Sequence, residues 1–278
     1  MAKPVRKYHV GQKSALDIVI AVVLGVMTLA AVFPFYQVVL LSFADMTSYA
    51  RHPLYLLPYC FDLTGYKTIF EDPMFFTSLG VTVFITLVGT TLNMLLSVMG
   101  AYVLSRKYLV GRKLFLNLII FTMLFNGGLI PTYLVVRDLK LVNTVWAMIL
   151  PCGISTYYLI IMKNYFMSLP DSLLEAARLD GATNFQVFRK VHMPLSMPII
   201  VYTALTSFTW PWSDYILPKL LLKTKNTWTV AVGLMSLGET EFSRFAAGSI
   251  FIAVPIVILY LFLAKYLING MVSGAVKE

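Results

Sequence analysis

The sequence predicts an all-α membrane protein with six transmembrane helices, and three observations support this fold class. Hydrophobic residues make up 59% of the 278 residues, and charged residues make up only 13%. A soluble domain needs roughly 25% charged residues to solvate its surface, so most of this surface should face lipid. The mean hydropathy is +0.79, and the apolar residues gather in stretches of about 20, the length that a helix needs to cross a bilayer.

Six stretches reach this length. In chain order they are Ile18–Leu41, Thr77–Leu104, Leu114–Val135, Thr144–Met162, Pro198–Leu217 and Ala247–Ile268. The third contains Asn126-Gly127-Gly128 and Pro131, and the fifth is interrupted by Trp210-Pro211-Trp212-Ser213-Asp214. Broken spans are tolerated where neighbouring helices or a watery cavity satisfy the freed backbone groups.

The first span follows a basic N-terminus and therefore resembles a signal peptide. Its apolar stretch, Ile18 to Phe43, is longer than the about 7 to 15 residues of a signal-peptide core, and no small-residue cleavage site follows it. We expect a retained membrane helix. The next segment, Ser42 to Phe76, is rich in Pro, Tyr and Phe and should fold over the outer membrane face.

Loop charges predict the orientation. Of the 22 Lys and Arg residues, fourteen lie in the N-terminal tail, in the connection 106–113, in the long loop 163–197 and at the C-terminal end. The other connections hold eight. The positive-inside rule then places both termini and the long loop in the cytoplasm. Because the net charge of +9 is spread over short loops, we expect no nucleic-acid partner.

The long polar loop, Lys163 to Met197, is the most informative segment. Pro170-Asp171-Ser172 is a helix-start signal, and Gly181 supplies the positive φ that ends a helix. A second short helix should follow and stop at Pro194 and Pro198. One interpretation is a pair of amphipathic helices on the lipid surface. The apolar stripe of the first helix, Leu173, Leu174, Ala177 and Leu179, is modest. The small residues of this segment favour contact with a partner protein instead.

The loop resembles the EAA loop of the inner-membrane subunits of ABC importers. The resemblance rests on Glu175-Ala176-Ala177, on Gly181 and on Val191 and Met193-Pro194, with Val191 and Met193 where the family usually has Ile and Leu. Asp180-Gly181-Ala182 and Pro194-Leu195 are similar to the carbohydrate-uptake, maltose-type branch. The segment 126–133, NGGLIPTY, resembles a subgroup that accompanies oligosaccharide uptake, and the whole resemblance covers roughly Phe75 to Ile268.

This resemblance implies a permease subunit with the MetI-like fold of type I importers in a bacterial inner membrane. It implies a second homologous permease (a heterodimer), two ATPase subunits that bind ATP and Mg, an extracytoplasmic solute-binding protein and membrane lipid as partners. The implied divisions are a cytoplasmic tail (1–17), the first helix and outer segment (18–74), the core with five helices and the coupling loop (75–270), and a second cytoplasmic tail (271–278). The ATPase-coupling residues would be Glu175, Ala176, Ala177, Asp180, Gly181 and Pro194.

Residues for chemistry are not evident. The sequence has no G-x-x-x-x-G-K-[ST] loop to cradle nucleotide phosphates, and its three histidines are scattered without metal-ligand spacing. Cys60 and Cys152 are most simply two unpaired thiols. We therefore expect no catalytic residue, no metal and no cofactor in this chain.

Candidate residues for the transport pathway combine flat aromatic faces with hydrogen-bonding groups, which suit sugar rings. They are Trp210, Trp212, Asp214, Tyr215, Asn126 and Asn93. An ionisable residue inside a span, as Asp214 would be, is a functional candidate. The alternative is an aromatic belt at the membrane surface with Asp214 outside it, and each Asn could instead bond a neighbouring helix.

A carbohydrate importer permease is the leading functional hypothesis. The alternatives are an ABC permease for an amino acid, peptide or phosphate, and a secondary transporter driven by an ion gradient. The latter usually needs internal repeats, and none is evident in the sequence. A membrane enzyme would need a catalytic constellation, and none is evident either.

Overall fold

The protein is a bundle of helices, seen here in a computed structural model that describes residues 15–52, 55–237 and 242–275. These ranges contain helices and no β-strand. The helices are α1 (Ala15–Ser42), α2 (Met46–Arg51), α3 (Thr64–Glu71), α4 (Pro73–Ser105), α5 (Arg112–Leu124), α6 (Leu129–Asp138), α7 (Trp146–Ile149), α8 (Thr156–Ser168), α9 (Asp171–Leu179), α10 (Asn184–Val187), the π-helix η1 (Phe188–His192), α11 (Met193–Leu195), α12 (Met197–Ser213), α13 (Ile216–Leu221), the 3₁₀ turn η2 (Lys225–Thr227), α14 (Val230–Met235) and α15 (Phe242–Ala275).

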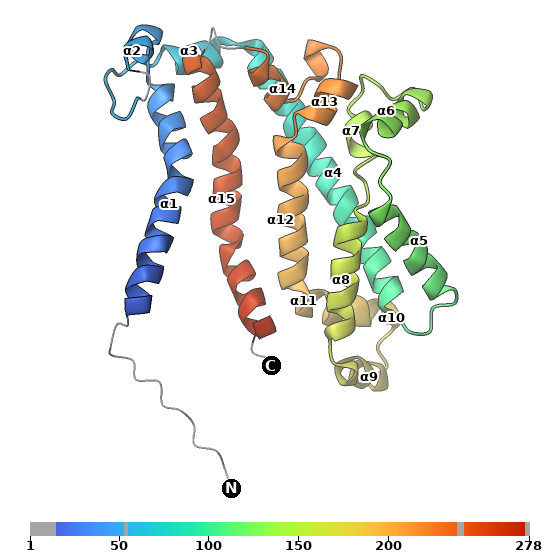
Figure 1. Ribbon diagram of the computed structural model, residues 1–278. Coiled ribbons are helices and arrows are strands. Elements are labelled where there is room, and N and C mark those ends of the chain that lie inside the picture. The colour runs from blue at the N-terminus through green and yellow to red at the C-terminus, as the bar shows by residue number, and fades with distance from the viewer. Residues whose placement is uncertain (1–14, 53–54, 238–241, 276–278) are drawn as a thin grey trace.

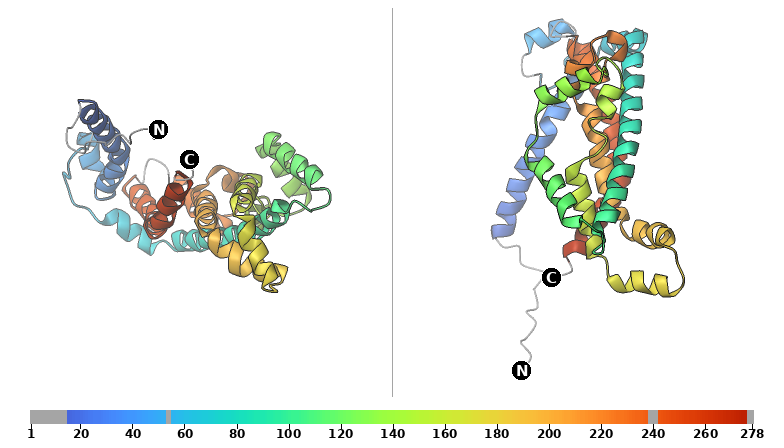
Figure 2. Two further views of the ribbon diagram at one scale, coloured as in Figure 1. Left: turned by 90° about the horizontal axis from the view of Figure 1, so that it is seen from below. Right: turned by 90° about the vertical axis from the view of Figure 1, so that its right-hand side faces the viewer.

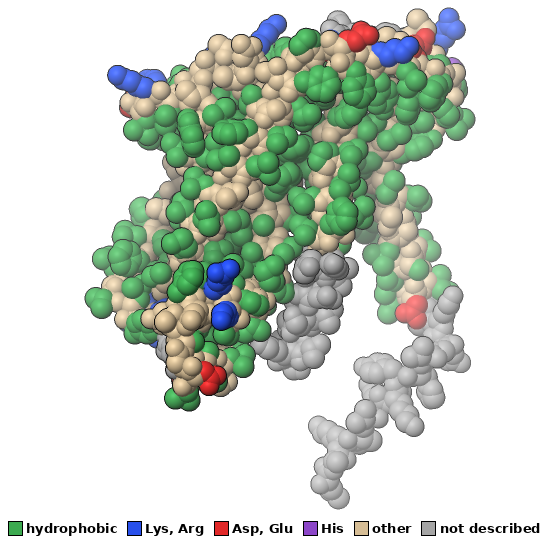
Figure 3. Space-filling model, turned by 180° about the vertical axis from the view of Figure 1, so that it is seen from behind, with side chains coloured by type: hydrophobic (Ala, Val, Ile, Leu, Met, Phe, Trp, Pro, Cys, Tyr) green, Lys and Arg blue, Asp and Glu red, His purple; other side chains and the backbone are tan. Residues whose placement is uncertain are grey.

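Three described helices, α1, α4 and α15, are long and apolar enough to cross a membrane, and the number rises to five if two bent helix pairs each count as one span. In Figure 1, α1, α4 and α15 run from one end of the molecule to the other, and α8 and α12 lie beside them. Figure 3 shows hydrophobic side chains over the middle of one face, with charged side chains near its two ends. The all-helical membrane architecture is thus confirmed, whereas the count of six spans stays a prediction.

The third predicted span, Leu114–Val135, is broken at the residues that the sequence indicates. The helices α5 and α6 meet at an angle of 112°. Between them, Gly128 has φ +83°, and Asn126 Oδ1 accepts a hydrogen bond from the Gly128 N–H at 2.9 Å. These residues turn the chain, so that α6 lies near the upper end of the bundle in Figure 1.

The fourth predicted span, Thr144–Met162, is wrong as one helix. The chain leaves α7 after one turn and passes Pro151 and Gly153 before α8 begins at Thr156. Ser155 Oγ then accepts a hydrogen bond from the Tyr158 N–H at 3.4 Å and caps α8. At 13 residues, α8 is about 20 Å long, shorter than the about 30 Å of apolar bilayer.

The fifth span is more regular than expected, because α12 continues through Pro211 to Ser213. Proline lacks an N–H group and leaves the carbonyl four residues earlier without its helical donor. That carbonyl belongs to Ser207, and it accepts a hydrogen bond from Thr90 Oγ1 of α4 at 3.3 Å. A neighbouring helix therefore satisfies the freed group, and α12 is joined to α4 at this level.

Helix α4 is central, since it packs against α8 on one side and against α12 on another, while α15 packs against α12, α3 and α1. Small residues permit close crossings. At Gly65 of α3, an added Cβ would lie 2.7 Å from the Ser243 carbonyl oxygen. Beside this crossing, Arg244 of α15 forms an ion pair with Asp72 at the N-cap of α4, so α3, α4 and α15 are fastened together at one end.

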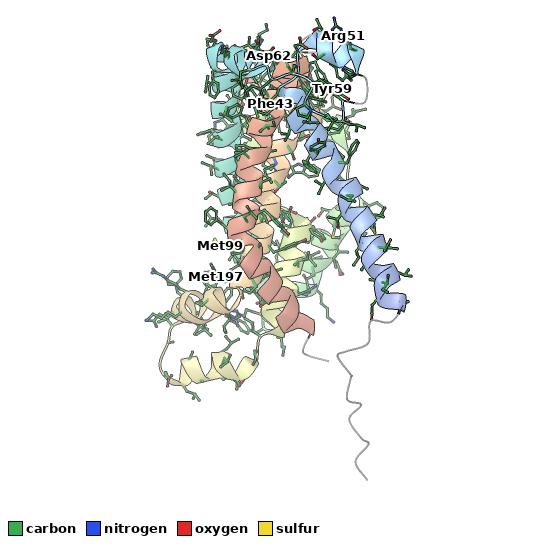
Figure 4. The ribbon with its side chains drawn as sticks, turned by 90° about the vertical axis from the view of Figure 1, so that its left-hand side faces the viewer. Phe43, Arg51, Tyr59, Asp62, Met99 and Met197 are labelled. Carbon is green, nitrogen blue, oxygen red and sulfur yellow. The ribbon has the colours of Figure 1, made fainter. Side chains whose placement is uncertain are left out.

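The segment between α1 and α4 lies across that same end of the bundle (Figure 4), where Phe43, Arg51, Tyr59 and Asp62 gather. Tyr55 is buried in it, with its hydroxyl 3.3 Å from Cys60 Sγ. The predicted tails lie largely outside the described residues on the N-terminal side. On the C-terminal side, α15 continues to Ala275, into the range expected to be a tail.

Candidate functional site

The loop between α8 and α12 forms two arms that project sideways from one end of the bundle (Figure 2, right). The first arm is α9. Its end was predicted at Gly181, and this is confirmed by φ +78° at that residue and by a hydrogen bond of 3.0 Å from the Ala182 N–H to the Ala177 carbonyl. This closing bond belongs to the Schellman motif. An added Cβ at Gly181 would meet nothing within 4 Å, so the backbone angle alone requires glycine.

The second arm is the helical run from Asn184 to Leu195. It begins with a capping box that the sequence analysis missed: Thr183 Oγ1 accepts from the Gln186 N–H, and Gln186 Oε1 accepts from the Thr183 N–H. The helix ends at Leu195, between Pro194 and Pro198, which confirms the predicted stop before the next span. The π-helix η1 widens the turn, with the Met193 N–H bonded to the Phe188 carbonyl, and the chain continues through Pro194 before it bends by 76° at Ser196.

The second arm is anchored to the bundle by His192, which is 1% exposed. Arg106 Nη2 lies 2.8 Å from His192 Nε2. The rings of Tyr102 and Phe166, from α4 and α8, contact the imidazole edge-on at centroid distances of 5.2 and 5.7 Å. In addition, the Tyr102 hydroxyl donates a hydrogen bond to the Asn184 carbonyl at 3.2 Å. The sequence gives no sign of this role, because His192 has no second histidine at metal-ligand spacing.

The side chains of the first arm face outward. Glu175, Ala176 and Asp180 are exposed and Ala177 is partly exposed, whereas Leu174 is buried against the bundle. Two apolar side chains nearby lie in the open: Leu179 is 89% exposed and Phe185 is 68% exposed. The arms therefore combine a fixed base with an accessible surface of small, acidic and apolar residues.

A cavity of 440 Å³ lies in the middle of the bundle, where the breaks in the third and fourth predicted spans approach α4 and α12. It brings together three of the predicted pathway residues, Asn93, Asn126 and Trp210. The residues that sequence reasoning missed include Ser155, Thr156, Tyr157, Tyr158 and Ser207. None of the residues that line the cavity carries a formal charge.

The polarity of the cavity comes partly from broken helices. Asn93 Nδ2 donates a hydrogen bond to the Cys152 carbonyl at 2.9 Å, a group left without a helical partner by the break after α7. Asn93 thus both bonds a neighbouring segment and lines the cavity. Pro151-Cys152-Gly153 is the sequence signal for the break that forms this part of the cavity wall, and it lies inside the fourth predicted span, Thr144–Met162.

Three further candidates lie outside the cavity. Trp212 is 4% exposed, and its Nε1 donates to the Ile252 carbonyl of α15 at 2.9 Å. Asp214 follows the last residue of α12, where Oδ1 accepts from the Ile216 N–H at 3.1 Å. Tyr215 does not line the cavity either. The placement of Asp214 at the end of α12 favours the alternative in which it lies near the outer surface.

Comparison with known proteins defines the class. The family described as binding-protein-dependent transport system inner membrane component matches residues 93–273. The chain belongs to this family and is a membrane permease subunit of ABC importers.

Individual relatives match over almost the full length. The chain is 36% identical to protein LplC of Bacillus subtilis, with 91% of this chain and 92% of the relative aligned. It is also 36% identical to the polygalacturonan/rhamnogalacturonan transport system permease protein YtcP of the same organism, over 94% and 98% of the two chains. Among solved structures, a chain of a bacterial ABC transporter involved in the import of the acidic polysaccharide alginate superposes with a TM-score of 0.84 at 29% identity, covering 93% of this chain and 99% of that one.

Proposed function

We propose that this chain forms half of the membrane pathway of an ATP-driven importer for an oligosaccharide. It would work with a second homologous permease, two ATPase subunits and an extracytoplasmic solute-binding protein. The similarity to permeases named for polygalacturonan and rhamnogalacturonan transport supports a saccharide cargo. ATP and Mg would be bound by the ATPase subunits.

One observation carries this proposal: the same helix serves the cavity and the arms. Asn93 of α4 lines the cavity, and Tyr102, nine residues later, holds the second arm through His192 and the Asn184 carbonyl. Nine residues of helix span about 14 Å. A displacement of the arms would therefore be transmitted to the cavity by a rigid element.

Closure of the two ATPase subunits on ATP would move the arms through contacts with α9, and the residues in position to make them are Glu175, Ala176, Ala177 and Asp180. Contacts that differ between the two states of the ATPase pair shift the equilibrium between inward-open and outward-open pathways. Gly181 would fix the angle between the arms. Pro194 lies within the second arm, so its role would be to hold that helix beside the bend at Ser196.

The composition of the cavity supports a sugar as cargo. Trp210 is 65% exposed and, with Tyr157 and Tyr158, offers aromatic faces. The amide of Asn126 and the hydroxyls of Ser155 and Thr156 offer hydrogen bonds to the hydroxyl groups at the edge of a sugar ring. The orientation with both termini and the arms in the cytoplasm is part of this proposal, and the excess of basic loop residues on that side supports it.

The test is uptake by vesicles that contain the chain with its second permease and ATPase subunits, supplied with the solute-binding protein and labelled oligogalacturonides. We expect uptake that requires ATP inside and the binding protein outside. Ion-gradient-driven uptake by vesicles with this chain alone would contradict the proposal. Uptake of an amino acid, peptide or phosphate with no uptake of any saccharide would overturn the cargo.

A further inference from the structure

An apolar groove of 510 Å³ lies between α5, α4 and α8, and none of the residues that line it lines the cavity described above. Leu96, Met99 and Val103 of α4 form one wall, and Phe115 and Ile119 of α5 form another. Every residue that lines the groove is apolar or glycine. No residue of α5 is buried, so the groove beside it is open to its surroundings.

The length of the groove along α4 is close to the thickness of one membrane leaflet. From Leu96 to Leu104, eight residues of α4 rise by about 12 Å, close to half of the about 30 Å apolar layer. Met99 lies toward the end of the molecule that carries the arms, on the same side as Met197 (Figure 4). An apolar occupant would thus lie in the leaflet next to the arms.

The mouth of the groove is basic. Arg112 Nε donates a hydrogen bond of 2.8 Å to the carbonyl of Leu104, a residue of the groove wall. Lys113 follows and is exposed. Arg106 and Lys107 lie in the same connection, and the sequence from Leu104 to Leu124 contains no Asp or Glu. Glu175 shares a separate cavity with Arg106 and Lys107.

We propose that this groove binds an anionic phospholipid, with one acyl chain against Met99 and Val103 and the phosphate beside Arg112 and Lys113. Basic residues at a membrane surface attract anionic headgroups, and the apolar walls suit a hydrocarbon chain. The inference is independent of the cargo and uses the proposed orientation only to name the leaflet.

The experiment is native mass spectrometry of the complete importer, released from detergent with phosphatidylglycerol or phosphatidylcholine added. We expect phosphatidylglycerol to be retained in preference to phosphatidylcholine. Lys113→Gln should lower that preference roughly fivefold, the effect of one basic residue near an anionic surface. The matched control is Lys67→Gln, an exposed lysine of α3 at the other end, and it should leave the preference unchanged.

Filling the groove tests the apolar part. Val103→Trp should abolish retention, whereas Leu118→Trp, on a part of α5 that does not line the groove, should not. Equal retention of the two lipids by the unaltered importer would overturn the proposal, and this measurement needs no variant. So would efficient cross-linking of Met99→Cys to the second permease, because a protein helix would then occupy the groove.

Discussion

Arg106 Nη2 and His192 Nε2 lie 2.8 Å apart, and this contact joins the end of α4 to the middle of the second arm. The guanidinium also lies over the Tyr102 ring, 4.2 Å from its centroid. Arg106 therefore holds two groups that bear on the position of the arm. In the proposed function, force applied to the arm reaches the bundle through this contact.

Replacing Arg106 by Met should weaken the anchor while keeping the apolar stem. Loss of a hydrogen bond to a buried partner costs about 1–3 kcal/mol. We expect faster amide hydrogen exchange over residues 184–195 and weaker ATPase stimulation by the loaded binding protein. Lys190→Met, an exposed change on the same arm, is the control. Unchanged exchange in Arg106→Met would show that the anchor does not hold the arm.

Substitutions at Gly181 should follow the backbone angle and not side-chain size. The φ of +78° costs about 1–2 kcal/mol for an ordinary L-residue, while the space around the site is open. We expect Gly181→Asn to retain more coupling than Gly181→Ala, and Gly181→Val to retain the least. ATPase assays of the complete importer measure the order. If Asn and Val behaved alike, the angle between the arms would not matter.

Gly65→Ala should loosen the end of the bundle where α3, α4 and α15 meet. Its new Cβ would meet the Ser243 carbonyl at 2.7 Å, and overpacking of this kind costs about 1–3 kcal/mol. Gly25→Ala in α1, where nothing lies within 4 Å, should be neutral or slightly stabilising because alanine favours helix. Thermal unfolding in detergent compares the two, and equal midpoints would contradict the close crossing.

The two neighbouring tryptophans should behave in opposite ways. Trp210→Ala removes an exposed ring of the cavity and should raise the apparent KM for the saccharide several-fold, with a stability change within about 0.5 kcal/mol. Trp212→Ala removes a buried ring that bonds the Ile252 carbonyl and should cost about 3–5 kcal/mol. Uptake and unfolding are measured on both. A transport defect without instability in Trp212→Ala would contradict the assignment.

Acid should loosen the segment between α1 and α4 through Asp45. Hydrogen bonds, above all from Ser48 and then Thr47, lower the pKa of Asp45 from 3.8 to about 2. The stabilisation is complete above the unfolded pKa, near pH 4, and is lost as the pH falls through about 2. Asp45→Asn keeps an N-cap and should remove this pH dependence. Proteolysis of residues 43–62 between pH 4 and 2 reports it, and identical profiles would exclude Asp45.

Local chemistry was predictable from sequence, whereas packing was not. Gly181 could be predicted because a helix end needs a positive φ, and the Asn126-Gly127-Gly128 break because few residues allow such a turn. By contrast, burial of His192 depends on Arg106, 86 positions away. Trp210 and Trp212 look alike in sequence, and only the position of α15 decides which is buried. The π-helix η1 before Pro194 has no sequence signal of this kind.

The interruption at Pro151 to Gly153 also bears on how the cavity can change. Part of its wall is main chain, as the Cys152 carbonyl held by Asn93 shows. Main-chain acceptors persist whatever side chain each position carries. Under the proposed function, exchanging Trp210, Ser155 or Tyr157 would then alter which saccharide is taken up without removing these main-chain acceptors, so the cavity would be a durable starting point for engineering altered uptake.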